Sequence, residues 1–361
     1  MMKKLIFLLL ILPTTVMAQV RLLSAGNPQI HNVILVVGDG MGVAQVYSSI
    51  IAQGGNTSQF LRFPYTGFSR TYSYDKYTTD SGAGGTALMT GYKVENKHIA
   101  FGPNGECYPS FLTRAKRQTG RKVGFVVTSS VLDATPAATY AHVPYRKQFD
   151  TISMQMAQCG FDVMIGGDKN HFLPAHRKDG WAPLDTLAAW GYRMAYTIDE
   201  LSQLHSGKVC GLLSDGDPLT APSRGRMLSV GVSKALELLS RGNQGLVLMV
   251  EGSQIDWACH NNDTTYLAAE MADFEEVLRL ILDFAQQDGH TLVVVTADHE
   301  TGGLTLPNGS VEQGTNRMSF STGNHTGVMV PVFAFGPGAN RFTGIQQNTD
   351  IPKKIMQLLG L

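Results

Sequence analysis

Five short apolar runs rich in β-branched residues constrain the fold of this chain more than any other feature. They lie at residues 33–37 (VILVV), 123–127 (VGFVV), 246–250 (LVLMV), 292–296 (LVVVT) and 331–335 (PVFAF). Continuous runs of this kind are typical of strands buried on both faces of a parallel sheet. Amphipathic stretches between them, clearest at 111–119 and 264–287, indicate helices. The alternation predicts a three-layer α/β/α sandwich around a central, largely parallel sheet.

The composition indicates a single globular domain. With 361 residues, of which 43% are hydrophobic, the chain can bury a large core. We expect one domain over residues 19–361, and we interpret the Gly-, Pro- and polar-rich stretch at about 168–222 as an excursion from it. Because the formal net charge is zero, nothing indicates a nucleic-acid partner.

Residues 1–18 have the pattern of a signal peptide. Lys3 and Lys4 precede an apolar run at 5–12, and the tripeptide at 16–18 (VMA) supplies small or apolar residues at a cleavage site. The run is too short to span a bilayer as a helix, and no Cys directly follows the cleavage site as a point of lipid attachment. We therefore expect a periplasmic or secreted protein without a membrane anchor.

The chain has four cysteines, Cys107, Cys159, Cys210 and Cys259. They are compatible with disulfides in an oxidising compartment, and the sequence leaves all three full pairings open. Cys259 adjoins His260, so a metal ligand is one interpretation. A buried thiol or a disulfide partner is favoured, because cysteine is among the residues most often buried.

Acids and histidines follow four of the five apolar runs. Asp39 comes after the first, Asp133 after the second, Glu251 after the third, and Asp298 with His299 after the fourth. Because the carboxyl ends of parallel strands meet at one sheet edge, these side chains should lie together, where open α/β sheets bind ligands. The candidate set is completed by Asp256, His260 and His325. Such oxygen and nitrogen donors suit several divalent ions, whose charge would offset the repulsion between the carboxylates.

Each cluster also has a simpler interpretation. The loop at 38–42 (GDGMG) resembles a dinucleotide-binding loop, but Val43 occupies the place of the third glycine. Asp298 and His299 could form an ordinary helix cap. Asp256 and His260, four residues apart, could form a salt bridge on one helical turn. Only their convergence at one edge favours a metal site over these alternatives.

The segment 78–91 (TTDSGAGGTALMTG) places Ser81 directly behind Asp80 and ahead of several small residues. A helix starting here would direct its N-terminus, and the Ser81 hydroxyl, towards an anion such as phosphate. The small residues would let this end of the helix approach another segment closely. The alternative is an ordinary N-cap on a glycine-rich packing helix.

Taken together, these motifs resemble the alkaline phosphatase family, in the family's order and from about Asn32 to the C-terminus. The matching residues are Asp39-Gly40-Met41-Gly42, Thr79-Asp80-Ser81, Asp133-Ala134-Thr135-Pro136, Arg146, Glu251 with Asp256 and His260, Asp298-His299, and His325-Thr326-Gly327. The resemblance implies a metal-dependent phosphomonoesterase that acts on small phosphate monoesters through a phosphoserine. Two zinc ions and one magnesium ion would be its cofactors, and it is a possible homodimer.

The resemblance also implies a role for each matching residue. One zinc would be held by Asp256, His260 and His325, a second by Asp39, Asp298, His299 and the Ser81 oxygen, and the magnesium by Asp39, Thr135 and Glu251, with Asp133 as an acid beside it. Ser81 would be the nucleophile and Arg146 the phosphate-binding guanidinium, whose alternative is a plain surface arginine. Trp257 departs from the family, because relatives carry a basic or histidine side chain there.

Two other functions compete with this one. A phosphodiesterase or nucleotide pyrophosphatase of the same superfamily would share the two-zinc core. The family resemblance implies that such enzymes tend to use a threonine nucleophile and to lack the set of Thr135, Glu251 and Arg146, which is complete here. A non-catalytic phosphate- or zinc-binding protein would have no need of Ser81.

Overall fold

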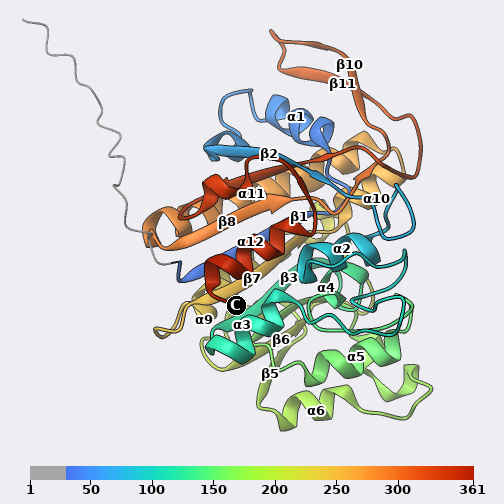
Figure 1. Ribbon diagram of the computed structural model, residues 1–361, viewed down its shortest axis with the longest axis vertical. Helices are drawn as coiled ribbons and strands as arrows, with labels where there is room; N and C mark the ends of the chain where they lie inside the picture. The colour runs from blue at the N-terminus through green and yellow to red at the C-terminus, as the bar shows by residue number, and fades with distance from the viewer. Residues whose placement is uncertain (1–29) are drawn as a thin grey trace, which may run out of the picture.

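The computed structural model describes residues 30–361, so the signal peptide predicted at 1–18 lies outside the described residues. Its centre is a ten-stranded sheet (Figure 1). From edge to edge the strands are β14 (Gly344–Gln347), β2 (Tyr65–Arg70), β13 (Val330–Phe335), β8 (Thr291–Thr296), β1 (Asn32–Gly38), β7 (Leu246–Gly252), β3 (Lys122–Ser130), β4 (Val163–Gly167), β6 (Lys208–Leu212) and β5 (Tyr192–Ala195). The seven strands from β8 to β5 are parallel. β13 runs antiparallel to both of its neighbours.

Helices cover both faces of this sheet (Figure 1). One face packs against α2 (Ser81–Thr90), α3 (Phe111–Thr119), α5 (Phe149–Gln158), α6 (Pro183–Ala189) and α12 (Asp350–Leu359). The other packs against α1 (Val43–Ala52), α7 (Ile198–Ser202), α9 (Met227–Leu239), α10 (Gln254–His260) and α11 (Thr264–Asp288). β1 shows why its run is continuously apolar, since Val33 and Leu35 enter the first core and Ile34 and Val36 the second. The predicted α/β/α sandwich is confirmed.

The two helices indicated by the sequence form with clear end signals. α3 begins after Ser110, whose hydroxyl accepts from the amide of Thr113, and it ends at Gly120 in the left-handed conformation. α11 begins after Asp263, which caps its first amides, and ends at Gly289 with a φ of 72°. Its buried face packs along the second core.

The segment at about 168–222 contributes directly to the central sheet. It contains β5 and β6, which form one end of the ten-stranded sheet, together with α6, α7 and α8 (Ala221–Arg224). The difference from the expected excursion has a physical reason. Both strands are short, and Arg193 in β5 and Gly211 in β6 interrupt their apolar residues, so neither shows the continuous apolar signal of the central strands.

A small two-stranded sheet brings a late part of the chain to the carboxyl edge of the central sheet. It pairs β9 (Glu300–Thr301) with β12 (His325–Thr326). Because β13 is antiparallel to β8, its N-terminal end lies where β8 ends, so the segment just before β13 reaches the same edge. The hairpin of β10 (Thr305–Ser310) and β11 (Thr315–Ser319) stands away from the body at the top of Figure 1.

All four cysteines are free in the structure, so none of the pairings left open by the sequence is present. Cys107 lies in an exposed segment, whereas Cys210 and Cys259 are buried in β6 and α10. Among the helices of residues 30–361, none combines the length and the apolar composition needed to cross a bilayer.

Candidate active site

The loops after four parallel strands converge at the carboxyl edge of the sheet. Asp39 follows β1, Asp133 follows β3, Glu251 lies at the end of β7, and Asp298 follows β8. The Asp39 amide donates to the carbonyl of Gly252 at 3.3 Å, which ties the loops after β1 and β7 together. Asp39, Glu251 and Asp298 are all buried. The structure thus gathers acids from four separate strands in one place.

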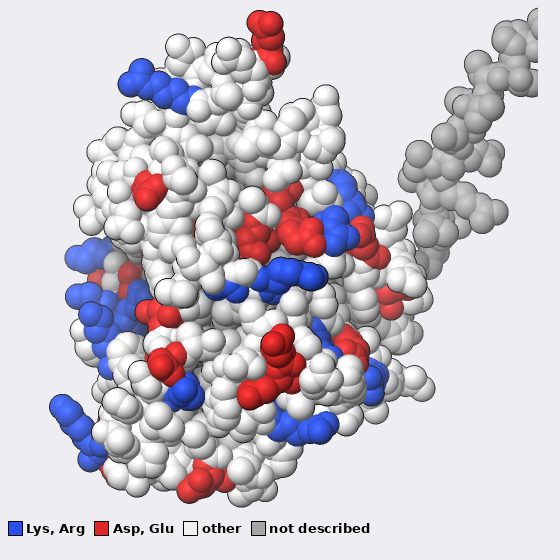
Figure 2. All heavy atoms as spheres, turned by 180° about the vertical axis from the view of Figure 1, so that it is seen from behind, with Lys and Arg blue, Asp and Glu red and all other residues white. Residues whose placement is uncertain are grey.

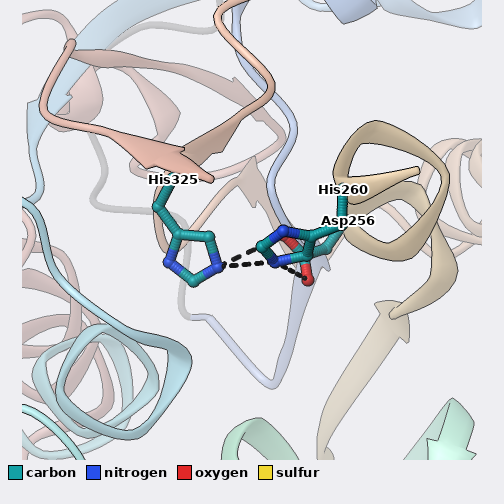
Figure 3. A group of neighbouring side chains, drawn as sticks. All are labelled: Asp256, His260 and His325. Atoms are coloured by element: carbon teal, nitrogen blue, oxygen red, sulfur yellow. Dashed lines mark hydrogen bonds and ion pairs between the residues drawn. The ribbon is translucent and has the colours of Figure 1, made fainter. Parts of the chain in front are cut away.

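A first triad consists of Asp256, His260 and His325 (Figure 3). Asp256 and His260 lie one turn apart on α10, and His325 comes from β12. Nε2 of His260 lies 3.0 Å from Nε2 of His325 and 3.2 Å from the Asp256 carboxylate. Nδ1 of His260 lies 2.7 Å from the carbonyl oxygen of Gly323, and Nδ1 of His325 lies 2.9 Å from that of Thr79. These contacts orient the two rings so that both Nε2 atoms face the Asp256 carboxylate.

Asp256 and His260 shift each other's pKa in opposite directions. The hydrogen bond to Asp256, offset in part by burial, raises the pKa of His260 to about 9. Burial alone would raise the pKa of Asp256, but the hydrogen bond to His260 and the charges of His299 and His325 lower it to about 2. Asp256 is therefore an ionised carboxylate at neutral pH, as a metal ligand must be.

A second triad consists of Asp39, Asp298 and His299, all buried. Nε2 of His299 lies 3.2 Å from Asp298 and 3.4 Å from Asp39. Burial, followed by the charge of His325, lowers the pKa of His299 to about 3, so its imidazole is neutral. Burial and the charge of Asp256 raise the pKa of Asp298 to about 6. Two carboxylates and a neutral imidazole meeting away from water form a site that favours a cation.

Unsatisfied polar atoms test whether divalent ions fit here. Asp39 Oδ1, Asp298 Oδ2 and Thr135 Oγ1 are buried and have no hydrogen-bond partner within residues 30–361. Buried polar atoms without partners are rare and costly, and clustering of such oxygens is typical of ion sites. The donors of the two triads are the nitrogen and oxygen atoms that zinc prefers. The side chains of the two triads therefore suit divalent metal ions such as zinc.

A third cluster offers oxygen donors only. Glu251 accepts from the Ser253 hydroxyl at 2.6 Å, and burial raises its pKa to about 8. Thr135 lies in α4 (Ala134–Ala137), a short helix that Asp133 caps by accepting from the Ala134 amide at 2.8 Å. Oxygen-only donors suit magnesium better than zinc.

Ser81 is the first residue of α2, and its Oγ lies 3.3 Å from Nε2 of His299. Asp80 caps the helix by accepting from the Ala83 amide at 3.0 Å. A Cβ atom at Gly84 would lie 3.1 Å from the Cβ and the carbonyl of Asp298, and one at Gly85 would lie 3.1 Å from Cα of Thr135. The small residues thus let α2 enter between the loops of two candidate metal sites.

Arg146 contacts Asp80, the residue that caps α2. Its Nη1 donates to Asp80 at 3.1 Å and its Nη2 to Asp133 at 2.9 Å. Burial would lower the pKa of Arg146, but the charges of Asp133 and Asp80 outweigh it and raise that pKa. The amide of Arg146 also donates to the Lys97 carbonyl at 2.8 Å. The guanidinium is therefore held at the site and is not a free surface arginine.

Several supporting residues were missed by sequence reasoning. Glu300 accepts from Gln45 at 2.8 Å, from the Leu304 amide at 3.1 Å and from the Thr326 hydroxyl, so it holds β9 and β12 together. Thr301 lies between the two triads. The only sequence signal for these two residues was their position, because they come next in the chain after His299. Cys259 is buried outside both triads, and Trp257 is half-buried on α10.

Comparisons with known proteins identify the family and the fold of this chain. The fold and the site define an α/β/α phosphatase, and the family model described as alkaline phosphatase matches residues 30–319. Alkaline phosphatase 4 of Bacillus subtilis (strain 168) is 32% identical, covering 92% of this chain and 89% of that protein. The chain belongs to the alkaline phosphatase family and is a phosphatase.

Solved structures show the same likeness. The alkaline phosphatase of the Antarctic bacterium TAB5 has a TM-score of 0.86 and 36% identity, covering 92% of this chain and 99% of that one. A variant of the TAB5 enzyme, described with Mg bound in its M3 site, has a TM-score of 0.85 and 34% identity, covering 93% of this chain and 99% of that one.

Proposed function

We propose that this chain is an exported, metal-dependent phosphomonoesterase that hydrolyses small phosphate monoesters through a covalent phosphate on Ser81. The observation that carries the proposal is the position of the Ser81 hydroxyl. It lies at the N-terminus of a ten-residue helix and 3.3 Å from Nε2 of His299, a member of the second triad. A hydroxyl so placed can attack phosphorus while the helix N-terminus favours the anion.

The surrounding residues bind and orient the ester. Arg146 presents a planar fork that can donate to two non-bridging phosphate oxygens, and Asp80 and Asp133 keep this fork in place. Divalent ions at the two triads would lower the pKa of the Ser81 hydroxyl and neutralise the charge that develops on the departing oxygen. Because the transition state of phosphoryl transfer is loose, placement of charge supplies most of the catalysis.

For the ions we propose zinc at each triad and magnesium at the oxygen-only cluster of Asp39, Thr135 and Glu251. The donor types support this assignment. The TAB5 variant with Mg in its M3 site supports a third ion in this fold. Trp257, one residue after Asp256, carries no charge, unlike the basic or histidine side chain that the family resemblance implies at this position.

Two rivals are less well supported. A phosphodiesterase of the same superfamily would have no use for the complete set of Thr135, Glu251 and Arg146. A non-catalytic zinc- or phosphate-binding protein would not require a hydroxyl 3.3 Å from His299. The leader pattern at 1–18 supports export, and N-terminal sequencing of the active protein should begin near residue 19.

A homodimer is also proposed. Its support is the exposure of two apolar side chains of α1, Val43 and Tyr47. A cavity of about 510 Å³ opens between α1 and the β10–β11 hairpin. Sedimentation of the purified protein measures its oligomeric state. A monomer at micromolar concentration would contradict a stable dimer.

The function is tested with one chromogenic phosphate monoester and the matching diester. We expect phosphate release from the monoester at least about 100-fold faster than from the diester. Chelation should abolish the release, and added zinc with magnesium should restore it. A faster diester reaction would favour the phosphodiesterase, and no turnover of either ester by the metal-loaded protein would favour the binding protein.

Figure 2 shows acidic and basic side chains interspersed on one face of the molecule. Where Lys and Arg side chains gather, at the left edge of this view, Asp or Glu side chains lie among them. This mixed pattern is not that of a polyanion-binding surface on the face that Figure 2 shows.

A further inference from the structure

Thr301 lies between the two triads and is fully buried. Its hydroxyl contacts the Asp256 carboxylate of the first triad and lies 3.2 Å from Nδ1 of His299 in the second. A single hydroxyl therefore contacts one side chain from each triad.

The backbone of Thr301 makes a second set of contacts with the same two groups. Thr301 pairs with His325 in the β9–β12 ladder, and His325 belongs to the first triad. The Thr301 amide donates to the carbonyl of Gly40 at 3.1 Å, next to Asp39 of the second triad. Its carbonyl accepts from Gln45 at 2.9 Å. Thr301 is thus held from both sides, and its hydroxyl has little freedom to turn elsewhere.

The direction of the two hydrogen bonds follows from the number of protons available. The Thr301 hydroxyl donates to Asp256, and a threonine hydroxyl has only one hydrogen to donate. The same hydroxyl must therefore accept from Nδ1 of His299. The His299 proton is then on Nδ1, and the lone pair of Nε2 faces Asp39, Asp298 and the Ser81 hydroxyl.

We propose that Thr301 is a positioning residue that couples the two metal triads, because one hydroxyl sets the tautomer of His299 and the orientation of Asp256. This inference rests on the proposed metal sites. It predicts that loss of the hydroxyl weakens both sites together, although Thr301 is a ligand in neither. The methyl group of threonine could fill the space equally well in valine, so packing alone does not require the hydroxyl.

The chain offers a matched control in Thr291. This residue is also fully buried, and its hydroxyl likewise donates to a carboxylate, that of Asp288 at 2.5 Å, and accepts from an N–H group, on Asn32 at 3.1 Å. It lies at the amino end of β8, whereas Asp298 and His299 follow the carboxyl end of the same strand. Thr291→Val removes the same kind of hydroxyl bond without contacting either triad.

The experiment measures zinc affinity in full-length protein by competition with a chromophoric chelator, for wild type, Thr301→Val, Thr301→Ser and Thr291→Val. Removing an outer partner of a metal ligand lowers affinity about 10- to 100-fold. We expect losses of this size for both zinc ions in Thr301→Val, recovery of most of the affinity in Thr301→Ser, and unchanged affinity in Thr291→Val. If Thr301→Val does not fold, Thr301→Ala gives the same comparison.

A second readout follows the tautomer directly. Nitrogen NMR of the His299 ring in zinc-free protein should show protonated Nδ1 in wild type and in Thr301→Ser, and a shift towards protonated Nε2 in Thr301→Val. Wild-type affinity for both ions in Thr301→Val would overturn the proposal, and so would a loss confined to one ion. Failure of the wild type to bind any zinc would instead refute the proposed function.

Discussion

Ser81 Oγ and His299 Nε2 lie 3.3 Å apart although 218 positions separate the two residues in the chain. Ser81 reaches this point because Gly84 and Gly85 let α2 approach the loops after β3 and β8. His299 reaches it because it directly follows Asp298 at the end of a buried parallel strand. The close approach of helix and strand end thus places the Ser81 hydroxyl, the proposed nucleophile, beside a candidate metal ligand.

The first prediction concerns His325. His325→Ala removes one of the three donors of the first triad, so zinc content should fall from about two to about one per chain. Hydrolysis of the phosphoserine should slow together with departure of the alcohol, because both depend on this site. Metal analysis and steady-state kinetics measure the two effects. Wild-type zinc content with a wild-type rate would sink the assignment.

The second prediction concerns the guanidinium group of Arg146. Arg146→Lys keeps the positive charge but cannot donate to two phosphate oxygens from one planar group. A hydrogen bond to a charged group contributes about 1.5–3 kcal/mol, so kcat/KM for a monoester should fall about 10- to 100-fold. Zinc content should not change. If Arg146→Lys kept full kcat/KM, the guanidinium would have no specific role in binding phosphate.

A third prediction tests the close approach of α2. A Cβ atom added at Gly84 would lie 3.1 Å from Asp298, so Gly84→Ala should destabilise the protein by about 1–3 kcal/mol through overpacking. Gly216→Ala is the control, because a Cβ atom there would meet nothing within 4 Å. Chemical denaturation compares the two variants. Equal stability would mean that α2 can shift without cost.

The fourth prediction is a pH dependence of stability at Lys93. Burial, and then the charge of Arg70, lower the pKa of Lys93 from 10.5 to about 8. Between these pH values the unfolded chain keeps a proton that the folded chain has released. The contribution of Lys93 to the free energy of unfolding therefore rises with pH across this window and is constant below it.

Lys93→Met isolates this contribution. The difference in the free energy of unfolding, wild type minus variant, should increase as pH rises from 8 to 10.5. Denaturant titrations at several pH values measure it. A difference that stays constant across the window would show that the folded and unfolded chains bind this proton equally.

Much of the fold could be predicted because its signals are local. The central strands are buried on both faces, so their apolar runs are continuous, and the acids lie directly beyond the ends of these runs. β5 and β6 were missed because they are short and their apolar residues are interrupted by Arg193 and Gly211. His325 lies just before β13 in the chain, and only the antiparallel direction of β13 brings it to the same edge of the sheet as the acids.

The supporting residues of the site could not be predicted in the same way. Thr301 contacts both triads only because a two-residue strand pairs it with His325, and so short a strand leaves no periodic pattern. Arg146 had no local signal either. Its position depends on Asp80 and Asp133, which lie 66 and 13 residues away in the chain. Contacts of this kind come from the tertiary arrangement.

Trapping the covalent phosphate tests the central claim most directly. Metal-loaded protein is mixed with a radiolabelled phosphate monoester, quenched in acid and digested, and the labelled peptide is sequenced. We predict that the label lies on Ser81, that chelation beforehand prevents labelling, and that Ser81→Ala is unlabelled while it retains its metals. A label on any other residue, or none in a wild-type protein that is turning over, would contradict the account.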